Sequence, residues 1–400
     1  MSDTGPKACP YPFGEADRLR LDPRYAEARS RQPLLRIRMP YGDEGWLVTR
    51  YEDVRTVLAD PRFSRALAAR SDEPRTRPVG SDDSGILGMD PPDHTRLRRL
   101  VSRAFTVRRV ERLRPRMAEI AEGLAEEMLE QGPPVDLVEA FALPLPVTVI
   151  CELLGVPYAD RERFRRWSEA FLSTTALSAE EIDRSFAEIY TYMHGLVELR
   201  RAHPADDLIT GLVEAGDAQD RLGEEEMVKL AIGLLVAGHE TTASQIPNFV
   251  YTLLTRPGAW ERLADDPGLV PSAVEELMRH IPLGASSAFP RYALEDVELS
   301  GGVVRAGQPV VVSLAAANRD PEIFDDPEEL VLERASNPHI GFGHGPHHCL
   351  GAQLARAELQ VGLRTLLARF PDLRFAVPEP ELSWKSGMLV RGLRAMPVTW

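Results

Sequence analysis

One long apolar segment, residues 224–256, constrains the fold of this chain more than any other part. Its stretch LAIGLLVAG is apolar on every side, which is typical of a helix buried within a large protein. The segment then continues into HETTAS and later Pro247, so Glu240 and Thr241 are expected deep inside, where polar groups need partners. Thr241 either bonds back to the preceding turn in a regular core helix or marks a local distortion beside a ligand.

Helical periodicity dominates from about Pro91 to Met278, and a further helix is expected over 350–369. The alternating stretches LLRIRM and WLVTR flank a turn and predict a hairpin, and short strands are expected within 292–313. We therefore predict one mainly α domain, 1–400, with a small β region. Its β-rich part covers about 30–52 and 290–315 plus C-terminal strands, and its α-rich part about 91–280 and 350–369.

Charge and cysteine content narrow the function classes. A net charge of −14 argues against a nucleic-acid binder, and three separated cysteines do not form a disulfide framework. Without a signal peptide or a membrane-spanning stretch in the sequence, a soluble, cytoplasmic protein is expected.

Basic residues are concentrated between Thr95 and Met117. This segment holds nine arginines, at 96, 98, 99, 103, 108, 109, 112, 114 and 116, against one acidic residue, Glu111. A solvated helix face and a docking face for an acidic partner are equally compatible with the run.

The stretch FGHGPHHCLGA, 342–352, places His344, His347, His348 and Cys349 among glycines and indicates a metal. Three of these side chains could bind zinc, but no fourth ligand is obvious. Alternatively, Cys349 begins the 350–369 helix, whose amides and dipole would stabilise a thiolate ligand. The glycines would then let the backbone lie against a flat, bulky ligand.

Three other motifs are weak when taken alone. HETTA resembles half of the zinc-protease helix H-E-x-x-H, but position 243 is alanine, so the second ligand is missing. In VEELMRH, Glu276 and Arg279 stand three residues apart on one helix face. In DPPDHTRLRRL, His94 and Arg98 stand four apart after a good helix start and suit carboxylate binding, although a solvated basic face is the more common explanation.

Together these stretches resemble the cytochrome P-450 family of haem-thiolate monooxygenases, in its bacterial branch. FGHGPHHCLG fits F-x-x-G-x-x-x-C-x-G and follows AGHETT and EELMR in the family's order. ANRDP, at 317–321, also agrees. The resemblance covers nearly the whole chain and implies the cytochrome P-450 fold, with haem b between the long central helix and the helix after the cysteine loop.

The resemblance also implies roles for individual residues. Cys349 would be the axial thiolate on the iron. Glu240 and Thr241 would deliver protons, and Gly238 would leave room for dioxygen. His94, Arg98, Arg291 and His347 would bind the haem propionates, while Phe342, Gly343 and Gly351 would line the cofactor. Glu276, Arg279 and Arg334 would form a buried ion network that supports the haem loop. His348 stands where an apolar residue is usual, and its role stays open.

The implied reaction inserts one oxygen atom from O2 into a C–H or C=C bond of a small hydrophobic substrate. The electrons would come from a ferredoxin and an NAD(P)H ferredoxin reductase, and the arginine-rich segment would then favour docking. The pocket is expected near 67–87, 171–190, 283–288 and 388–390, with Val236, Ala237, Leu283, Ala285, Ala288, Leu389 and Val390 lining it. A monomer that modifies a macrolide, other polyketide, terpenoid or steroid in secondary metabolism, such as antibiotic biosynthesis, is expected. A zinc hydrolase using His239, Glu240 and the 344–349 cluster and a non-catalytic haem sensor that keeps Cys349 are the alternatives.

Overall fold

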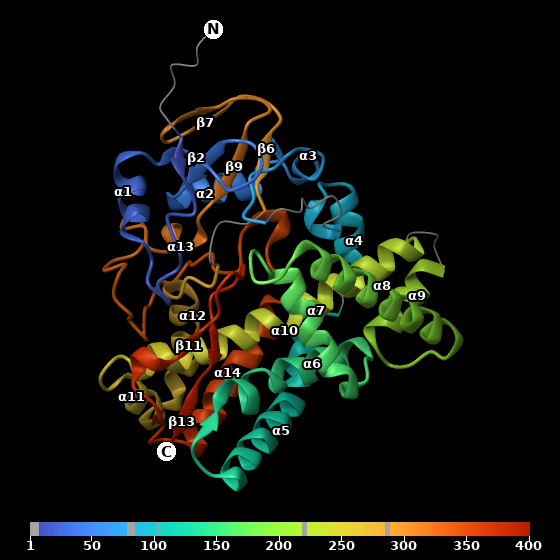
Figure 1. Ribbon diagram of the computed structural model, residues 1–400, viewed down its shortest axis with the longest axis vertical. Helices are drawn as coiled ribbons and strands as arrows, with labels where there is room; N and C mark the ends of the chain where they lie inside the picture. The colour runs from blue at the N-terminus through green and yellow to red at the C-terminus, as the bar shows by residue number, and fades with distance from the viewer. Residues whose placement is uncertain (1–7, 78–84, 103, 218–221, 285–288) are drawn as a thin grey trace. The chain divides into compact units, whose positions relative to one another are not determined.

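A computed structural model describes residues 8–77, 85–102, 104–217, 222–284 and 289–400 of the chain (Figure 1). The chain divides into two compact units. The sheet unit comprises Met1–Arg96, Met278–Leu330 and Ala335–Cys349, and the helical unit comprises Leu97–Leu277, Val331–Arg334 and Leu350–Trp400. The division falls inside two helices, α4 (Asp93–Ser102) and α12 (Val270–His280).

The sheet unit is built on a six-stranded sheet of order β1-β2-β3-β9-β6-β4. The predicted hairpin is confirmed, since β2 and β3 pair antiparallel with Leu34 opposite Val48. The strands of this sheet are β1 (Cys9–Pro10), β2 (Leu34–Arg38), β3 (Gly45–Val48), β4 (Phe63–Ser64), β6 (Arg291–Ala293) and β9 (Pro309–Val312). A separate hairpin joins β7 (Val297–Leu299) and β8 (Gly302–Val304). The predicted strands within 292–313 are thus present, whereas the two-residue strands β1 and β4 were too short to predict.

Four short helices cover this sheet, because the apolar side chains of the strands need partners on their buried face. They are α1 (Pro23–Arg31), α2 (Tyr51–Ala59), α3 (Arg65–Ala68) and α13 (Leu314–Ala317), and two 3-10 turns accompany them, η1 (Gly85–Gly88) and η5 (Gly345–His347). Val54 and Val57 of α2 are wholly buried and join Val310 of β9 in one hydrophobic core. This core fixes α2, against which the cysteine loop packs.

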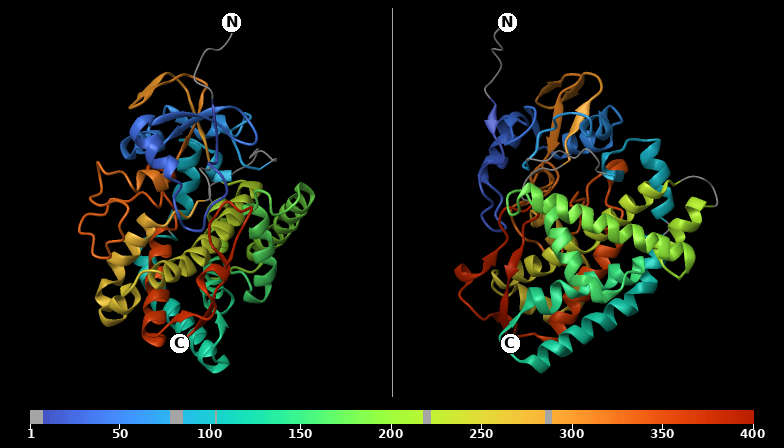
Figure 2. Two further views of the ribbon diagram at one scale, coloured as in Figure 1. Left: turned by 60° about the vertical axis from the view of Figure 1, so that its left-hand side comes forward. Right: turned by 45° about the vertical axis from the view of Figure 1, so that its right-hand side comes forward.

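The helical unit is organised around α10 (Glu224–Leu254), which confirms the predicted central helix. Helix α6 (Pro144–Leu154) and α14 (Ala352–Arg369) pack on α10, and α5 (Val107–Gln131) packs along α14 (Figures 1 and 2). The other helices are α7 (Arg161–Leu172), α8 (Ala179–Ala202), α9 (Leu208–Asp217) and α11 (Ala259–Asp265), with the short turns η2 (Val138–Ala142), η3 (Tyr158–Asp160), η4 (Pro267–Leu269) and η6 (Glu379–Glu381). The helix predicted over 350–369 begins two residues later than expected, with Gly351 at its N-cap.

The strands of the helical unit form two small sheets. One has the order β10-β13-β5 and the other pairs β11 with β12. The strands are β5 (Val135–Asp136), β10 (Arg374–Phe375), β11 (Ser383–Trp384), β12 (Leu393–Ala395) and β13 (Pro397–Thr399). The C-terminal strands were predicted, while β5 lies inside the part that was predicted to be helical. In the part of the chain that the structure describes, no helix combines the length and hydrophobicity that crossing a membrane requires.

Candidate active site

Cys349 closes a tight loop in the sheet unit. Its N–H donates a 2.8 Å hydrogen bond to the Phe342 carbonyl, across the turn formed by η5. Cys349 is exposed, whereas Cys151 is buried, and burial raises the pKa of the Cys151 thiol to about 12. Cys349 is therefore accessible to a ligand in a way that Cys151 is not. Cys349 precedes α14 by three residues, so it does not begin the helix as expected, while support of a thiolate by the helix amides stays a prediction.

The loop is held by its own backbone geometry and by the ANRDP segment. Gly345 has φ +71°, and a Cβ there would lie 2.5 Å from the Leu58 carbonyl oxygen, so only glycine fits. The Asn318 side chain accepts the Ile340 N–H at 2.8 Å. Asp320 accepts the first N–H of α2 at 2.9 Å. These contacts make the position of the cysteine loop depend on α2 and on the motif at 317–321.

A cluster of basic side chains lies in the same unit, which we call the basic cluster: Arg65, His94, Arg291 and His347. The rings of His94 and His347 lie 4.2 Å apart between centroids. Burial, together with nearby Arg65, lowers the pKa of Arg291 to about 10, and Asp90 partly opposes this shift. Burial, then His94, Arg291 and Arg65, lowers the pKa of His347 to about 3.

The basic cluster contains one buried guanidinium that lacks a direct partner within the described ranges of the chain. Arg291 is only 6% exposed, and among the described residues its guanidinium has no hydrogen-bond or ion-pair partner. A buried guanidinium without a counter-ion is costly, so the site calls for an anion. The two carboxylates of a cofactor would meet this need. The structure also brings three of the predicted propionate ligands (His94, Arg291 and His347) into one cluster.

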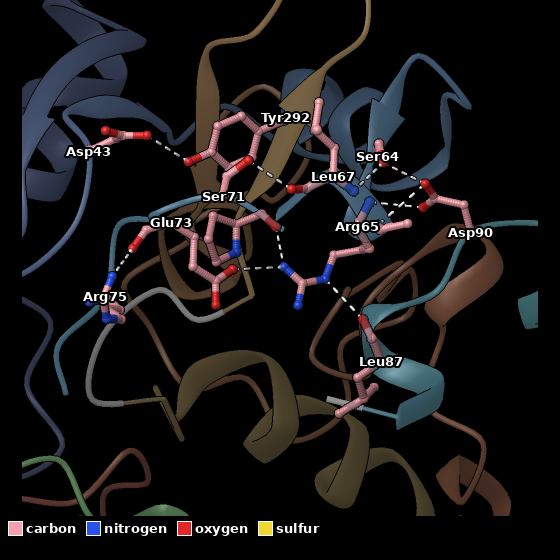
Figure 3. A network of polar contacts seen from close by, with 12 residues as sticks. Asp43, Ser64, Arg65, Leu67, Ser71, Glu73, Arg75, Leu87, Asp90 and Tyr292 are labelled. Carbon is pink, nitrogen blue, oxygen red and sulfur yellow. Dashed lines mark hydrogen bonds and ion pairs between the residues drawn. The ribbon is translucent and has the colours of Figure 1, made fainter. Parts of the chain in front are cut away.

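Arg65 is a member of the basic cluster that the sequence did not reveal. Figure 3 shows its side chain between β6 and the turn at Leu87, where Nε donates to the Leu87 carbonyl at 3.0 Å. Its guanidinium also lies 3.5 Å from the Glu73 carboxylate, and its backbone N–H donates to Asp90 at 2.8 Å. No local motif marks Arg65 in the sequence, because its partners come from three separate segments. Arg98, the fourth predicted propionate ligand, belongs to the helical unit and stays a prediction.

In the helical unit, α10 is buried except along one stripe. Between Leu230 and Val250 the only exposed or half-exposed positions in this fully described stretch are Gly233, Leu234, Ala237, Gly238 and Thr241. Their spacing of three and four residues places them on one helix face. An open stripe on an otherwise buried apolar helix is suited to a ligand rather than to solvent. Gly238 and Thr241, both candidate site residues from the sequence, lie on it. Thr241 is therefore half-exposed and not deep inside as expected, whereas Glu240 is buried as expected.

The side chains on this stripe refine two predictions. The Thr241 hydroxyl donates to the Ala237 carbonyl at 3.1 Å, so the bond to the preceding turn is confirmed. Helix α10 continues without a break through this point, so of the two alternatives the structure favours the regular core helix over a local distortion. At Gly238 a Cβ would lie 2.7 Å from Cδ1 of Ile150, so close packing against Ile150 explains why a glycine stands here. Its predicted role in admitting dioxygen stays a prediction.

Two buried carboxyl groups flank the stripe. Glu240 is 2% exposed, and its Oε1 lies 2.5 Å from the Lys385 ammonium, a partner that the sequence analysis missed. Glu358 on α14 is wholly buried beside Thr242, and burial raises the pKa of its carboxyl well above the usual range, which the contact with Thr242 only partly offsets. One acid is therefore ion-paired, and the other is held in an environment that favours its neutral form.

One pair of the predicted ion network is observed directly. In the helical unit, Glu276 is wholly buried, accepting Nε of Arg334 at 3.0 Å and the Val331 N–H at 2.9 Å. In the sheet unit, Arg279 donates to the carbonyls of Asn318, Pro327 and Glu329 at 2.8–2.9 Å. The pair of Glu276 with Arg334 is therefore observed, and Arg279 also anchors the segment around 318–329.

The structure brings together two segments of the predicted pocket. Leu389 N–H donates to the Leu172 carbonyl at 2.7 Å, and Ser173 forms a bridge with Met388. Val236 and Val390 are buried, Leu283 and Leu389 are half-buried, and Ala237 is exposed. Ala285, Ala288 and residues 78–84 of the predicted lining lie outside the described residues.

The structure supports a zinc site neither in the cysteine loop nor at His239 and Glu240. Among the described residues, no three His, Cys, Asp or Glu side chains are grouped so that they could hold a metal ion together. His239 is wholly buried, its Nδ1 lies 2.7 Å from the Leu235 carbonyl, and burial lowers its pKa. Haem ligation needs only one protein side chain on the iron, so it does not require such a group.

The arginine-rich segment is partly neutralised within the chain. Arg114 pairs with Glu111, and Arg116 pairs with Glu119 and Glu152. By contrast, three arginines at the start of α5 are exposed and have no partner among the described residues: Arg108, Arg109 and Arg112. An exposed basic face therefore remains at this end of α5, while Arg103 lies outside the described residues.

Comparison with known proteins agrees with this site. A sequence model of the cytochrome P450 family matches residues 268–391. Mycinamicin IV hydroxylase/epoxidase from Micromonospora griseorubida is 55% identical over 400 residues, which are 100% of both chains. Nocardicin C N-oxygenase from Nocardia uniformis subsp. tsuyamanensis is 53% identical over 391 residues, 98% of each chain.

Solved structures show the same likeness. The crystal structure of HinD with NMFT and NO has a TM-score of 0.96 at 55% identity and covers 99% of this chain and 100% of that one. A variant of the mixed-function P450 MycG in complex with mycinamicin IV has a TM-score of 0.91 at 55% identity, covering 98% and 100%. With a cysteine loop, a basic cluster and an open stripe on α10, this chain belongs to the cytochrome P450 family and is a haem-dependent monooxygenase with the P450 fold.

Proposed function

We propose that this enzyme uses haem b to insert one oxygen atom from O2 into a bulky, mostly apolar natural product. The proposal rests on one observation: the Cys349 thiol lies close to the basic cluster, which needs an anion. His347 of the basic cluster is two residues from Cys349, in a loop that Gly345 and Asn318 hold against the sheet unit. A cofactor whose metal takes one thiolate and whose two carboxylates need basic partners suits this arrangement.

In this proposal Cys349 binds the iron and the basic cluster binds the propionates. Arg291 and His94 supply charge-assisted hydrogen bonds, and Arg65 keeps Arg291 in a field that favours an anion. Arg98 would add a further contact from the helical unit, and Phe342, Gly343 and Gly351 would lie along the cofactor. Haem, when bound through a thiolate, supplies the activation of dioxygen that no amino-acid side chain can provide.

The residues of α10 would handle protons. Glu240 takes up a proton at its carboxylate, and Thr241 passes one on through Oγ1, which accepts a proton while its own is handed forward. In the structure the Thr241 hydroxyl donates to the Ala237 carbonyl at 3.1 Å, so this hydrogen bond would open when the hydroxyl hands its proton forward and would re-form with the proton that Oγ1 accepts. Gly238 keeps that stripe free of a side chain.

The choice of substrate class rests on the relatives. Their names refer to mycinamicin IV, nocardicin C, vitamin D3 and biflaviolin. The pocket would be lined by Val236, Ala237, Leu283, Leu389 and Val390, which are aliphatic, with Ala285 and Ala288 completing it. An apolar lining with few polar groups suits such scaffolds.

Electrons would arrive from a ferredoxin that an NAD(P)H-dependent reductase keeps reduced. The exposed arginines at the start of α5 (Arg108, Arg109 and Arg112) offer an acidic protein a basic face. Opposite charges steer such encounters and speed association at low salt.

A substrate screen tests this function. The haem-loaded enzyme would be titrated with mycinamicin IV, nocardicin C and vitamin D3, and the Soret band followed for the shift that marks displacement of water from the iron. We expect a shift with at least one of these scaffolds and, with ferredoxin, reductase, NAD(P)H and ¹⁸O2, a product that gains one labelled oxygen atom. A product whose new oxygen comes from water, or no shift with any bulky apolar scaffold, would contradict the proposal.

A further inference from the structure

We propose that Lys385 is a positioning residue for Glu240, fixing one carboxylate oxygen so that the other is free to exchange protons. The inference rests on the proposed role of Glu240 and adds a residue that lies 145 positions away in the sequence. It concerns only the helical unit, where both residues are described.

The contact itself is short and buried. Lys385 Nζ lies 2.5 Å from Oε1 of Glu240 and 3.2 Å from Oγ of Ser244, one turn further along α10. The Glu240 side chain is 3% exposed and the Lys385 side chain 17% exposed. At this depth an ion pair is screened little by water, so its geometry is well defined.

The pair leaves one oxygen of Glu240 unused. Oε1 is the oxygen bound by the ammonium, and the structure assigns Oε2 no hydrogen-bond partner among the described residues. A carboxylate held at one oxygen cannot rotate freely, so Oε2 keeps a constant direction. A proton taken up at Oε2 leaves again from the same place.

Lysine is rare in this chain, and its chemistry suits the contact with Glu240 better than that of arginine. Only three of its 47 basic residues are lysines: Lys7, Lys229 and Lys385. Arginine would present a planar fork that binds both oxygens of a carboxylate, whereas an ammonium acts as a compact point charge. A lysine at this position therefore binds Oε1 without occupying Oε2.

The backbone around Lys385 is fixed independently of its side chain. The Lys385 N–H donates to the Gly392 carbonyl at 2.9 Å, in line with the pairing of β11 and β12. Gly392 lies so close to α10 that a Cβ there would be 3.1 Å from the Ser244 Cβ. The Asn248 side chain donates to the Arg391 carbonyl at 3.1 Å. Removing the ammonium therefore leaves the hairpin on α10, and the consequences fall on Glu240.

The test uses the haem-loaded full chain and needs no substrate. Four variants are compared with wild type: Lys385→Met, Lys385→Arg, Glu240→Gln and the double variant Lys385→Met with Glu240→Gln. Lys229→Met is the matched control, because Lys229 pairs with Glu225 on the same helix but at an exposed site. The first measurement is the rate at which the chemically reduced enzyme returns to the ferric state in air-saturated H2O and D2O.

We expect Lys385→Met to lower this rate by on the order of tenfold, within the range that a misplaced proton donor can cause, and to enlarge the solvent isotope effect. Lys385→Arg, which restores the charge, should recover part of the loss. Lys385→Met should add nothing in the Glu240→Gln background, and Lys229→Met should behave as wild type.

The second measurement is thermal unfolding of the same variants, which reports the ion pair without any chemistry. The two single variants should be non-additive, because each removes a partner of the same contact. Non-additive unfolding with an unchanged rate and isotope effect in Lys385→Met would overturn the positioning role and leave a purely structural pair. If Glu240→Gln itself has the wild-type rate and isotope effect, the proposed function of Glu240 fails, and the role of Lys385 fails with it.

Discussion

Removing Arg334 from the buried pair with Glu276 is expected to be one of the most destabilising single changes in the helical unit. The Glu276 side chain is 0% exposed and that of Arg334 9% exposed, so water cannot replace the guanidinium. In Arg334→Met, Oε2 of Glu276 loses its 3.0 Å hydrogen bond, while Oε1 keeps the Val331 N–H at 2.9 Å. Losing one partner of a buried ion pair typically costs ~3–5 kcal/mol of unfolding free energy, and we expect a value in this range.

A second variant shows whether the unpaired Glu276 charge causes the loss of stability in Arg334→Met. In the Glu276→Gln background no carboxylate is left behind, so the additional cost of Arg334→Met should fall to about 1 kcal/mol. Arg262→Met is a matched control, because Arg262 pairs with Glu333, the residue next to Arg334, at an exposed site. This control should change the unfolding free energy by ~0–1 kcal/mol.

Urea unfolding of the haem-loaded variants, followed by circular dichroism, measures these differences as shifts in midpoint at a constant slope. If Arg334→Met destabilises no more than Arg262→Met, the buried pair does not have the importance assigned to it. An equal cost of Arg334→Met with and without the Glu276 carboxylate would show that lost packing, rather than lost charge, is responsible.

Three further predictions concern other parts of the site. Burial raises the pKa of Glu358, so folding favours its neutral form, and the wild type loses stability as the pH rises above the unfolded pKa of about 4.3. The melting temperature of Glu358→Gln should therefore rise relative to that of the wild type between about pH 4 and about pH 7. A difference in melting temperature that does not change with pH would refute this. Gly238→Ala should cost ~1–3 kcal/mol by pressing on Ile150, which is 2.7 Å from the added Cβ, and melting should show that Ile150→Ala relieves part of this cost, whereas strict additivity would locate the strain elsewhere. Changing Arg109 and Arg112 to Glu should weaken ferredoxin binding in low-salt titrations while leaving substrate-induced spectral shifts intact, and unchanged affinity would remove α5 from the docking face.

The features that the sequence predicted well are those with a local signal. The apolar run of α10, the hairpin of β2 and β3 and the spacing around Cys349 each depend on residues close together in the chain. Periodicity and motif spacing therefore sufficed to predict the central helix, the cysteine loop and the burial of Glu240, whereas Thr241, also expected deep inside, lies on the open stripe.

The features that were missed depend on long-range contacts. Lys385 reaches Glu240 from 145 residues away, and Arg65 meets Arg291 only after two distant segments join one sheet. Glu358 stands on a regular helix face, and nothing in its neighbours along the chain shows that its carboxyl is wholly buried. Even the scarcity of lysine, which singles out Lys385, does not indicate its partner. Such pairings follow from tertiary packing, which no local pattern encodes.

The central claim is that Cys349 is the thiolate ligand of a haem, and the ferrous–CO spectrum tests it most directly. The reduced wild-type enzyme with CO should show the strongly red-shifted Soret band of thiolate ligation, and Cys349→Ser should lose that band. Cys151→Ser, which changes a buried thiol outside the loop, should retain it. A wild-type band at the position of histidine ligation, or a red-shifted band that survives in Cys349→Ser, would contradict the assignment.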